Sequence, residues 1–173
     1  PGADPVFATR LAEVLAEDAR EEREALRLLE RSLRLRPSDA AALSAQAGLV
    51  YPSHGWLRFG YQKGAPQDRY KAIYEGSGLP LILFQYPDAT KCTYDLQTQL
   101  DIAAQPGVFA MKNGVRNMKR WDREIPVIRA ERPDLQILTC HDEYLLHTMF
   151  DVDGALVGYG CVAPELLVQM IAA

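Results

Sequence analysis

The chain has 173 residues, 48% of them hydrophobic, and a formal net charge of −4. Such a chain can bury a substantial core, and its charge gives no reason to expect a nucleic-acid or membrane partner. No apolar run is long enough to cross a bilayer, and residues 1–15 lack a signal-peptide pattern. Cys92, Cys140 and Cys161 lie too far apart for a disulfide framework or a zinc site, which favours a reducing compartment. We therefore expect a soluble, cytoplasmic protein.

Residues 1–48 are expected to form a helical segment. They are rich in Ala, Leu, Glu and Arg, and Leu26, Leu29 and Leu33 place an apolar stripe on one face of a helix. Residues 25–43 are similar to part of a tetratricopeptide repeat, although a single partial repeat cannot bury its own apolar face. The segment is therefore either a helical hairpin or a partial tetratricopeptide-like unit.

From residue 49 onward, short apolar runs alternate with stretches of helical spacing. Strands are expected at 49–52, 79–86, 108–111, 135–139 and 155–158, and helices at 68–74, 94–104, 121–131, 143–150 and 164–171. Strands that alternate with helices in this way predict βαβ units and a parallel sheet. Polar residues at the strand ends then meet at one edge, where the active sites of α/β proteins lie. Five strands suffice for an open sheet or for part of a barrel.

Lys112 directly follows the apolar run 108–111, and Pro106 and Gly114 bound this stretch. An apolar run between turn residues is typical of a fully buried strand. A lysine at the end of such a strand either extends its head group to water or is withdrawn from water. Burial lowers the pKa of an ammonium group, and a neutral amine can attack a carbonyl carbon to form a Schiff base. Lys112 is therefore a candidate nucleophile.

Four segments, in order, resemble the Schiff-base aldolase family of dihydrodipicolinate synthase and N-acetylneuraminate lyase. They are LPLILFQYP (79–87), VFAMKN (108–113), ILTCHD (137–142) and DGALVGYGCVAP (153–164). They are similar to the fifth to eighth strands of the family's (β/α)8 barrel, and the stretch after residue 48 is similar to the end of the fourth strand. The resemblance implies a partial TIM-type barrel over residues 49–173. It also implies a lyase that acts on a 2-oxo acid such as pyruvate, without a cofactor or a metal, and in which Lys112 forms the imine.

Two positions depart from the family, one on the first of these segments and one two residues beyond its end. Phe84 stands where the family carries a tyrosine that relays protons. Tyr86 lies on the same strand face, because side chains alternate along a strand, and it either takes over this relay or only packs. Ala89 stands where the family carries a substrate-binding arginine. A carboxylate on a second substrate therefore has to be held by another group.

Further residues are expected to contact the substrate. His54 and His141 follow presumed strand ends, and Phe84 and Tyr159 are expected to line the same pocket. His141 beside Asp142 suits acid–base work, whereas the alternative makes Asp142 the N-cap of the next helix.

Nothing in the sequence resembles the first three strands of the barrel or the loop that holds the pyruvate carboxylate. A half barrel exposes apolar sheet edges. We therefore expect the N-terminal helices, a second copy in a homo-oligomer, or a complementing partner to cover these edges. The competing hypothesis is a catalytically impaired half barrel that serves as an assembly or protein-interaction module.

Overall fold

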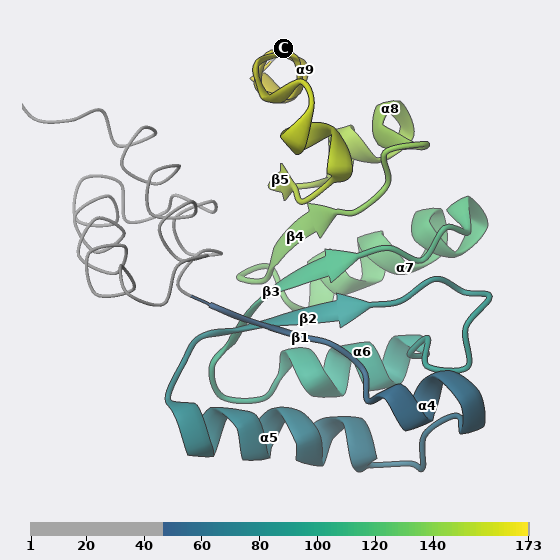
Figure 1. Ribbon diagram of the computed structural model, residues 1–173, viewed down its shortest axis with the longest axis vertical. Helices are drawn as coiled ribbons and strands as arrows, with labels where there is room; N and C mark the ends of the chain where they lie inside the picture. The colour runs from purple at the N-terminus through teal and green to yellow at the C-terminus, as the bar shows by residue number, and fades with distance from the viewer. Residues whose placement is uncertain (1–46, 173) are drawn as a thin grey trace, which may run out of the picture. The chain divides into compact units, whose positions relative to one another are not determined.

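The computed structural model describes residues 47–172, with side chains for 47–170. In this part of the chain, five strands form one sheet in the order β1-β2-β3-β4-β5. They are β1 (Gly48–Val50), β2 (Leu81–Gln85), β3 (Val108–Asn113), β4 (Gln136–Thr139) and β5 (Gly154–Ala155). The pairs from β2 to β5 are parallel, and the arrowheads of β2, β3 and β4 point to the same side in Figure 1. The predicted α/β class is confirmed, whereas the helical segment expected at 1–48 lies almost wholly outside the described residues.

Helices connect the strands, so that each βα unit follows the previous one along the sheet (Figure 1). They are α4 (His54–Phe59), α5 (Ala65–Ser77), α6 (Leu96–Ala103), α7 (Met118–Glu131), α8 (Leu145–Thr148) and α9 (Pro164–Ala172), with short 3-10 turns η1 (Met149–Asp151) and η2 (Gly158–Cys161). The short helix α4 was not predicted; its N-cap residue, Ser53, makes no capping hydrogen bond through its side chain.

The segment that follows β4 differs most from its prediction. We expected a helix over 143–150, but α8 begins at Leu145. Asp142 does not cap that helix, because its two carboxylate oxygens accept the backbone N–H groups of Gly158 (3.1 Å) and Tyr159 (2.8 Å). These bonds hold the start of the turn η2, and the strand predicted at 155–158 is observed one residue earlier and shorter, as Gly154–Ala155 of β5. The predicted cap and strand length are both wrong for this reason.

One face of the sheet packs against α5, α6 and α7 and forms the main core. The buried side chains there come from the sheet and from these helices and include Tyr70, Leu83, Ile102, Met111, Trp121, Ile125, Ile128 and Ile137. Removing this apolar surface from water supplies most of the driving force for the fold. The core therefore leaves the opposite face of the strands, and their carboxyl ends, free to carry other functions.

The strand register decides which residues share that opposite face. In the parallel pairs, Phe84 lies beside Lys112, and Lys112 lies beside Leu138. Because side chains alternate between faces, these three project away from the helix-covered core. A side chain added at Gly114, two residues beyond Lys112, would meet the Phe84 ring and the Cβ atom of Cys140 at 3.4 Å. Glycine therefore keeps open the space next to the end of the lysine strand.

A buried tyrosine connects the first two strands behind this face. The Tyr70 hydroxyl on α5 donates to the carbonyl of Val50 (3.1 Å) and accepts the backbone N–H of Phe84 (3.3 Å). It is fully buried, so both hydrogen bonds form away from water. Tyr70 thus holds the end of β1 against the part of β2 that carries Phe84.

Candidate functional site

Lys112 lies on β3 with its side chain against an aromatic ring. Its Nζ atom is 4.5 Å from the centroid of the Phe84 ring, and the residue is half-buried. This distance is within the range of a cation–π contact, in which the face of the ring attracts the ammonium group. Phe84 itself is 9% exposed and has no polar atom in its side chain. It therefore serves as an apolar support that fixes where the lysine head group lies.

Two tyrosines complete the aromatic cluster around Phe84. The ring of Tyr86 is 4.7 Å from that of Phe84, and the ring of Tyr51 is 5.4 Å from Phe84 and 6.3 Å from Tyr86. Burial raises the pKa of Tyr86, and the neighbouring Tyr51 raises it further. The structure thus brings together three of the predicted site residues, Lys112, Phe84 and Tyr86. Sequence reasoning missed Tyr51, although alternation from the core residue Val50 places it on the Lys112 face.

Buried polar side chains hold the loop that follows β2. Gln85 donates to the carbonyl of Tyr94 (2.8 Å) and accepts the backbone N–H of the same residue (3.0 Å). Arg120 on α7 donates to the carbonyl of Tyr94 (2.7 Å) and to Asp88, and it binds both oxygens of Glu124 (2.9 and 3.0 Å). Burial alone raises the pKa of Glu124, but the bonds from Arg120 and Gln99 outweigh that effect and leave the pKa below its ordinary value. The loop beyond Tyr86 is therefore firmly held.

His141 lies away from Lys112, in the interior between sheet and helices. Its side chain is fully buried and meets the Trp121 ring edge-on at 5.2 Å. Both ring nitrogens are engaged, because Nε2 accepts the backbone N–H of Arg116 (3.0 Å) and Nδ1 lies 3.1 Å from the hydroxyl of Thr139. Removal from water lowers the pKa of His141 to about 4, although the Glu143 carboxylate opposes this shift. This arrangement favours a structural role over the substrate contact that we predicted.

The hydrogen bonds also define the tautomer of the His141 ring. Since Nε2 accepts, Nδ1 carries the proton and donates it to Thr139. The Thr139 hydroxyl lies 2.8 Å from that of Thr148, which in turn donates to the carbonyl of Tyr144 (3.2 Å). A neutral imidazole satisfies every donor and acceptor in this series. In a protonated ring, the N–H at Nε2 would point at the backbone N–H of Arg116, and neither group could accept a hydrogen bond.

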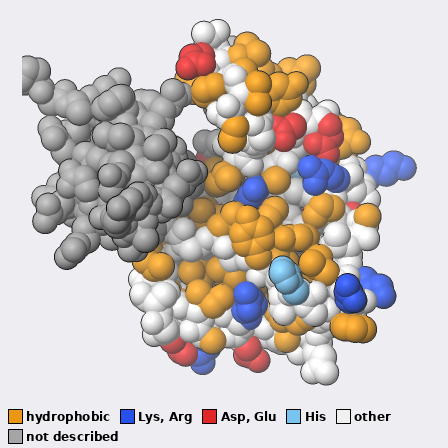
Figure 2. Space-filling model, viewed as in Figure 1, with side chains coloured by type: hydrophobic (Ala, Val, Ile, Leu, Met, Phe, Trp, Pro, Cys, Tyr) orange, Lys and Arg blue, Asp and Glu red, His pale blue; other side chains and the backbone are white. Residues whose placement is uncertain are grey.

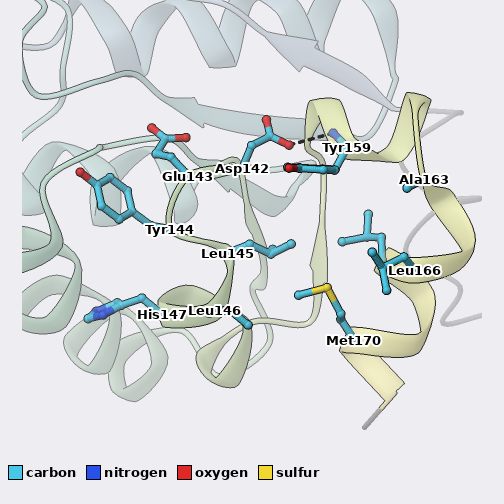
Figure 3. A pocket seen from close by; sticks show the side chains of 11 residues that line it. Asp142, Glu143, Tyr144, Leu145, Leu146, His147, Tyr159, Ala163, Leu166 and Met170 are labelled. Carbon is cyan, nitrogen blue, oxygen red and sulfur yellow. Dashed lines mark hydrogen bonds between the residues drawn. The ribbon is translucent and has the colours of Figure 1, made fainter.

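Tyr159 lines a different hollow, which the structure places between α8 and α9 (Figure 3). This hollow measures about 430 Å³ and is mainly apolar, with Leu145, Leu166 and Met170 among its lining residues. Figure 2 shows hydrophobic side chains over the middle of the visible face and again at its upper end, where α9 lies. Among the residues that line the hollow, Leu146 is 71% exposed and Leu166 54%. The structure therefore does not bring Tyr159 to the Lys112 cluster.

His54 is the first residue of α4 and is exposed. No hydrogen bond or ring contact joins it to Lys112, Phe84 or Tyr86 in the described part of the chain. Its predicted substrate contact stays a prediction. Among residues 47–172, no three metal-ligating side chains gather at one place. None of the helices described is both long and apolar enough to span a membrane.

Parallel strands joined by helices, with Lys112 near the carboxyl end of β3, are the arrangement found in part of a (β/α)8 barrel. The chain belongs to the dihydrodipicolinate synthetase family, whose model matches residues 60–173. It is 29% identical over 138 residues to the probable 2-dehydro-3-deoxy-D-pentonate aldolase YjhH of Escherichia coli K12. This match covers 76% of the present chain and 46% of the E. coli protein. It is also 25% identical over 95 residues to 4-hydroxy-tetrahydrodipicolinate synthase of Xylella fastidiosa. That match covers 55% of the present chain and 30% of the X. fastidiosa protein.

Solved structures of the family have the same fold. The chloride-inhibited dihydrodipicolinate synthase of Acinetobacter baumannii, complexed with pyruvate, matches with a TM-score of 0.64 and 21% identity, over 98% of this chain and 58% of that one. The enzyme from Bacteroides thetaiotaomicron matches with a TM-score of 0.59 and 19% identity, over 98% of this chain and 57% of that one. The predicted partial barrel and family are confirmed. The chain spans about half the length of the curated relative from E. coli.

Proposed function

We propose that the protein is an aldolase-type lyase that acts on a 2-oxo acid such as pyruvate through a Schiff base on Lys112. The observation that carries the proposal is the position of the Lys112 amine, 4.5 Å from the Phe84 ring and at the carboxyl end of a parallel strand. Membership of the dihydrodipicolinate synthetase family supports it, as does the pyruvate complex of the A. baumannii enzyme.

In the proposed reaction, the Nζ atom of Lys112 attacks the carbonyl carbon of the 2-oxo acid. The carbinolamine that forms loses water and becomes an imine. Loss of a proton from the neighbouring carbon gives an enamine, whose carbon attacks an aldehyde, and hydrolysis then releases the product and the free lysine. Tyr86 is the residue to which we assign the proton transfers, because its ring lies 4.7 Å from that of Phe84, which contacts Lys112.

Trapping the imine tests this proposal. The protein is incubated with pyruvate and borohydride, and peptide mass mapping should locate a reduced pyruvyl group on Lys112. Lys112→Ala should remove the adduct. Lys71→Ala is the matched control, because Lys71 is an exposed lysine paired with Glu75, and this variant should keep the adduct. A wild-type protein without an adduct, or an adduct that survives Lys112→Ala, contradicts the proposal.

A second candidate function is that of an assembly module without catalysis. The observation that favours it is the group of exposed apolar side chains near the last helices: Leu146, Phe150, Val162, Leu166 and Val168. Exposed apolar clusters of this kind mark sites of protein association. Native mass spectrometry tests the idea, since a monodisperse monomer contradicts it. The homo-oligomer, the complementing partner and the cytoplasmic location stay predictions.

A further inference from the structure

The hydroxyl of Tyr70 joins facing backbone groups of two neighbouring strands. It accepts the N–H of Phe84 on β2 (3.3 Å) and donates to the carbonyl of Val50 on β1 (3.1 Å). Gln85, the next residue of β2, turns its carbonyl to the other side, where it accepts the N–H of Gly114 at 2.9 Å. Backbone groups of successive residues in a strand point to opposite neighbours, so the Phe84 N–H points towards β1. The tyrosine therefore fixes the end of β1 to the part of β2 that faces it.

Burial makes this bridge a permanent one. Tyr70 is 0% exposed and Val50 4%, and both belong to the main core. Removal from water raises the pKa of Tyr70 well above its ordinary value, and the neighbouring Tyr94 raises it further. The hydroxyl thus keeps its proton and remains a donor. Without it, two backbone groups inside the core would lose their partner.

The residue before Tyr70 holds the next carbonyl along the chain. The Nε atom of Arg69 donates to the carbonyl of Tyr51 at 3.2 Å. Two successive residues of α5 therefore hold two successive carbonyls at the point where the chain leaves β1. The ring of Tyr51 meets that of Phe84 edge-on, at 5.4 Å and an interplanar angle of 79°. Such a contact depends on the placement of both rings, and α5 fixes the backbone that carries each of them.

The Phe84 ring connects this bridge with the lysine. Phe84 lies beside Lys112 in the strand register, and the Lys112 Nζ atom is 4.5 Å from the centroid of the ring. No hydrogen bond or ion pair joins Lys112 to another described residue. Contact with the ring therefore largely determines where the amine lies. A reacting group that is misplaced by about 1 Å can lose about a hundredfold in rate.

We propose that Tyr70 is a positioning residue for the reaction at Lys112. Its hydroxyl holds Phe84 against the end of β1, and through the rings of Phe84 and Tyr51 it places the lysine amine for attack on the 2-oxo acid. Tyr70 acts from the helix-covered side of the sheet and does not touch the amine. This inference rests on the proposed function. It gives a core tyrosine an effect on the reaction rate in addition to its effect on stability.

Tyr70→Phe tests the proposal, because it removes the hydroxyl and keeps the ring. Adduct formation with pyruvate and cyanoborohydride is followed by mass spectrometry over a range of pyruvate concentrations. The maximal rate should fall by roughly ten- to hundredfold, as expected for a misplaced amine. The pyruvate concentration that gives half of this rate should change much less, since the substitution removes no group that contacts pyruvate. Ile73→Val is the matched control: it lies on the same helix, packs against the same core and leaves the bridge intact. It should keep the wild-type rate.

A third variant measures the contribution of the donor alone. p-Aminophenylalanine at position 70 keeps a donor for the Val50 carbonyl but offers the Phe84 N–H a weaker acceptor, so its rate should lie between those of the wild type and Tyr70→Phe. Thermal unfolding establishes that each variant is folded at the assay temperature. If Tyr70→Phe is not folded, the aminophenylalanine variant takes its place and should react more slowly than Ile73→Val.

The outcomes separate this inference from the proposed function. A wild-type protein without an adduct overturns both. A wild-type adduct, together with a folded position-70 variant that reacts as fast as Ile73→Val, overturns this inference alone.

Discussion

Replacing His141 by glutamine should change how the stability of the protein depends on pH. His141 is fully buried, and removal from water lowers its pKa from an ordinary 6.5 to about 4. Between these two values the unfolded chain binds a proton at this site and the folded chain does not. Stability from this group is therefore complete above about pH 6.5 and is lost as the pH falls towards 4.

The size of the effect follows from the two pKa values. Between pH 7 and pH 4 the wild type should lose on the order of 3 kcal/mol of unfolding free energy through His141, about 2 kcal/mol of it by pH 5. The glutamine side chain cannot titrate, but its carbonyl oxygen can still accept the backbone N–H of Arg116. Between pH 7 and pH 4, the unfolding free energy of His141→Gln should therefore fall by about 3 kcal/mol less than that of the wild type.

Urea unfolding at a series of pH values, followed by far-ultraviolet circular dichroism and tryptophan fluorescence, measures the difference between the two proteins. Carboxylates with lowered pKa, such as Glu124, destabilise both proteins in acid, so the difference isolates His141. Ile128→Ala is the control, because it opens a cavity in the same core without altering a titratable group. Its curve should run parallel to that of the wild type. If the curve of His141→Gln is also parallel, the ring is not held neutral and the reasoning is refuted.

Three further predictions concern the residues around the site. Tyr86→Phe should slow imine trapping by about 10²- to 10⁴-fold, the usual contribution of a proton-transfer group, and a larger loss in Tyr51→Phe would reassign that role. Glu124→Ala should cost about 1–3 kcal/mol in urea unfolding, because the largely buried Arg120 loses one of its two carboxylate partners and keeps Asp88. Glu75→Ala, from an exposed pair, should change stability by less than about 1 kcal/mol. Tyr70→Phe should cost about 1–3 kcal/mol, since the backbone groups of Val50 and Phe84 lose a buried partner, and a smaller loss would show that water replaces the hydroxyl.

Much of the fold could be predicted from the sequence, because it depends on local patterns. The strand at 108–111 and the helix at 121–131 were predicted in place, since a short apolar run and a helical apolar spacing each mark their own element. The predictions failed where a distant side chain decides the backbone. The strand expected at 155–158 is short because Asp142 binds the N–H groups of Gly158 and Tyr159, which lie far along the chain. No local pattern contains that contact.

The residues of the site could be predicted only where the alternation of side chains between the two faces of a strand was taken into account. Lys112 lies beside Leu138 on the neighbouring strand, so that the next residue on the same face is Cys140 and not His141. A polar residue at a strand end is therefore not enough to place a side chain in the active site, because every second one points into the helix-covered core. The same rule places Tyr51 on the Lys112 face, since Val50 belongs to the core. Within this fold, His141 instead holds the backbone of Arg116, in the loop that continues the lysine strand.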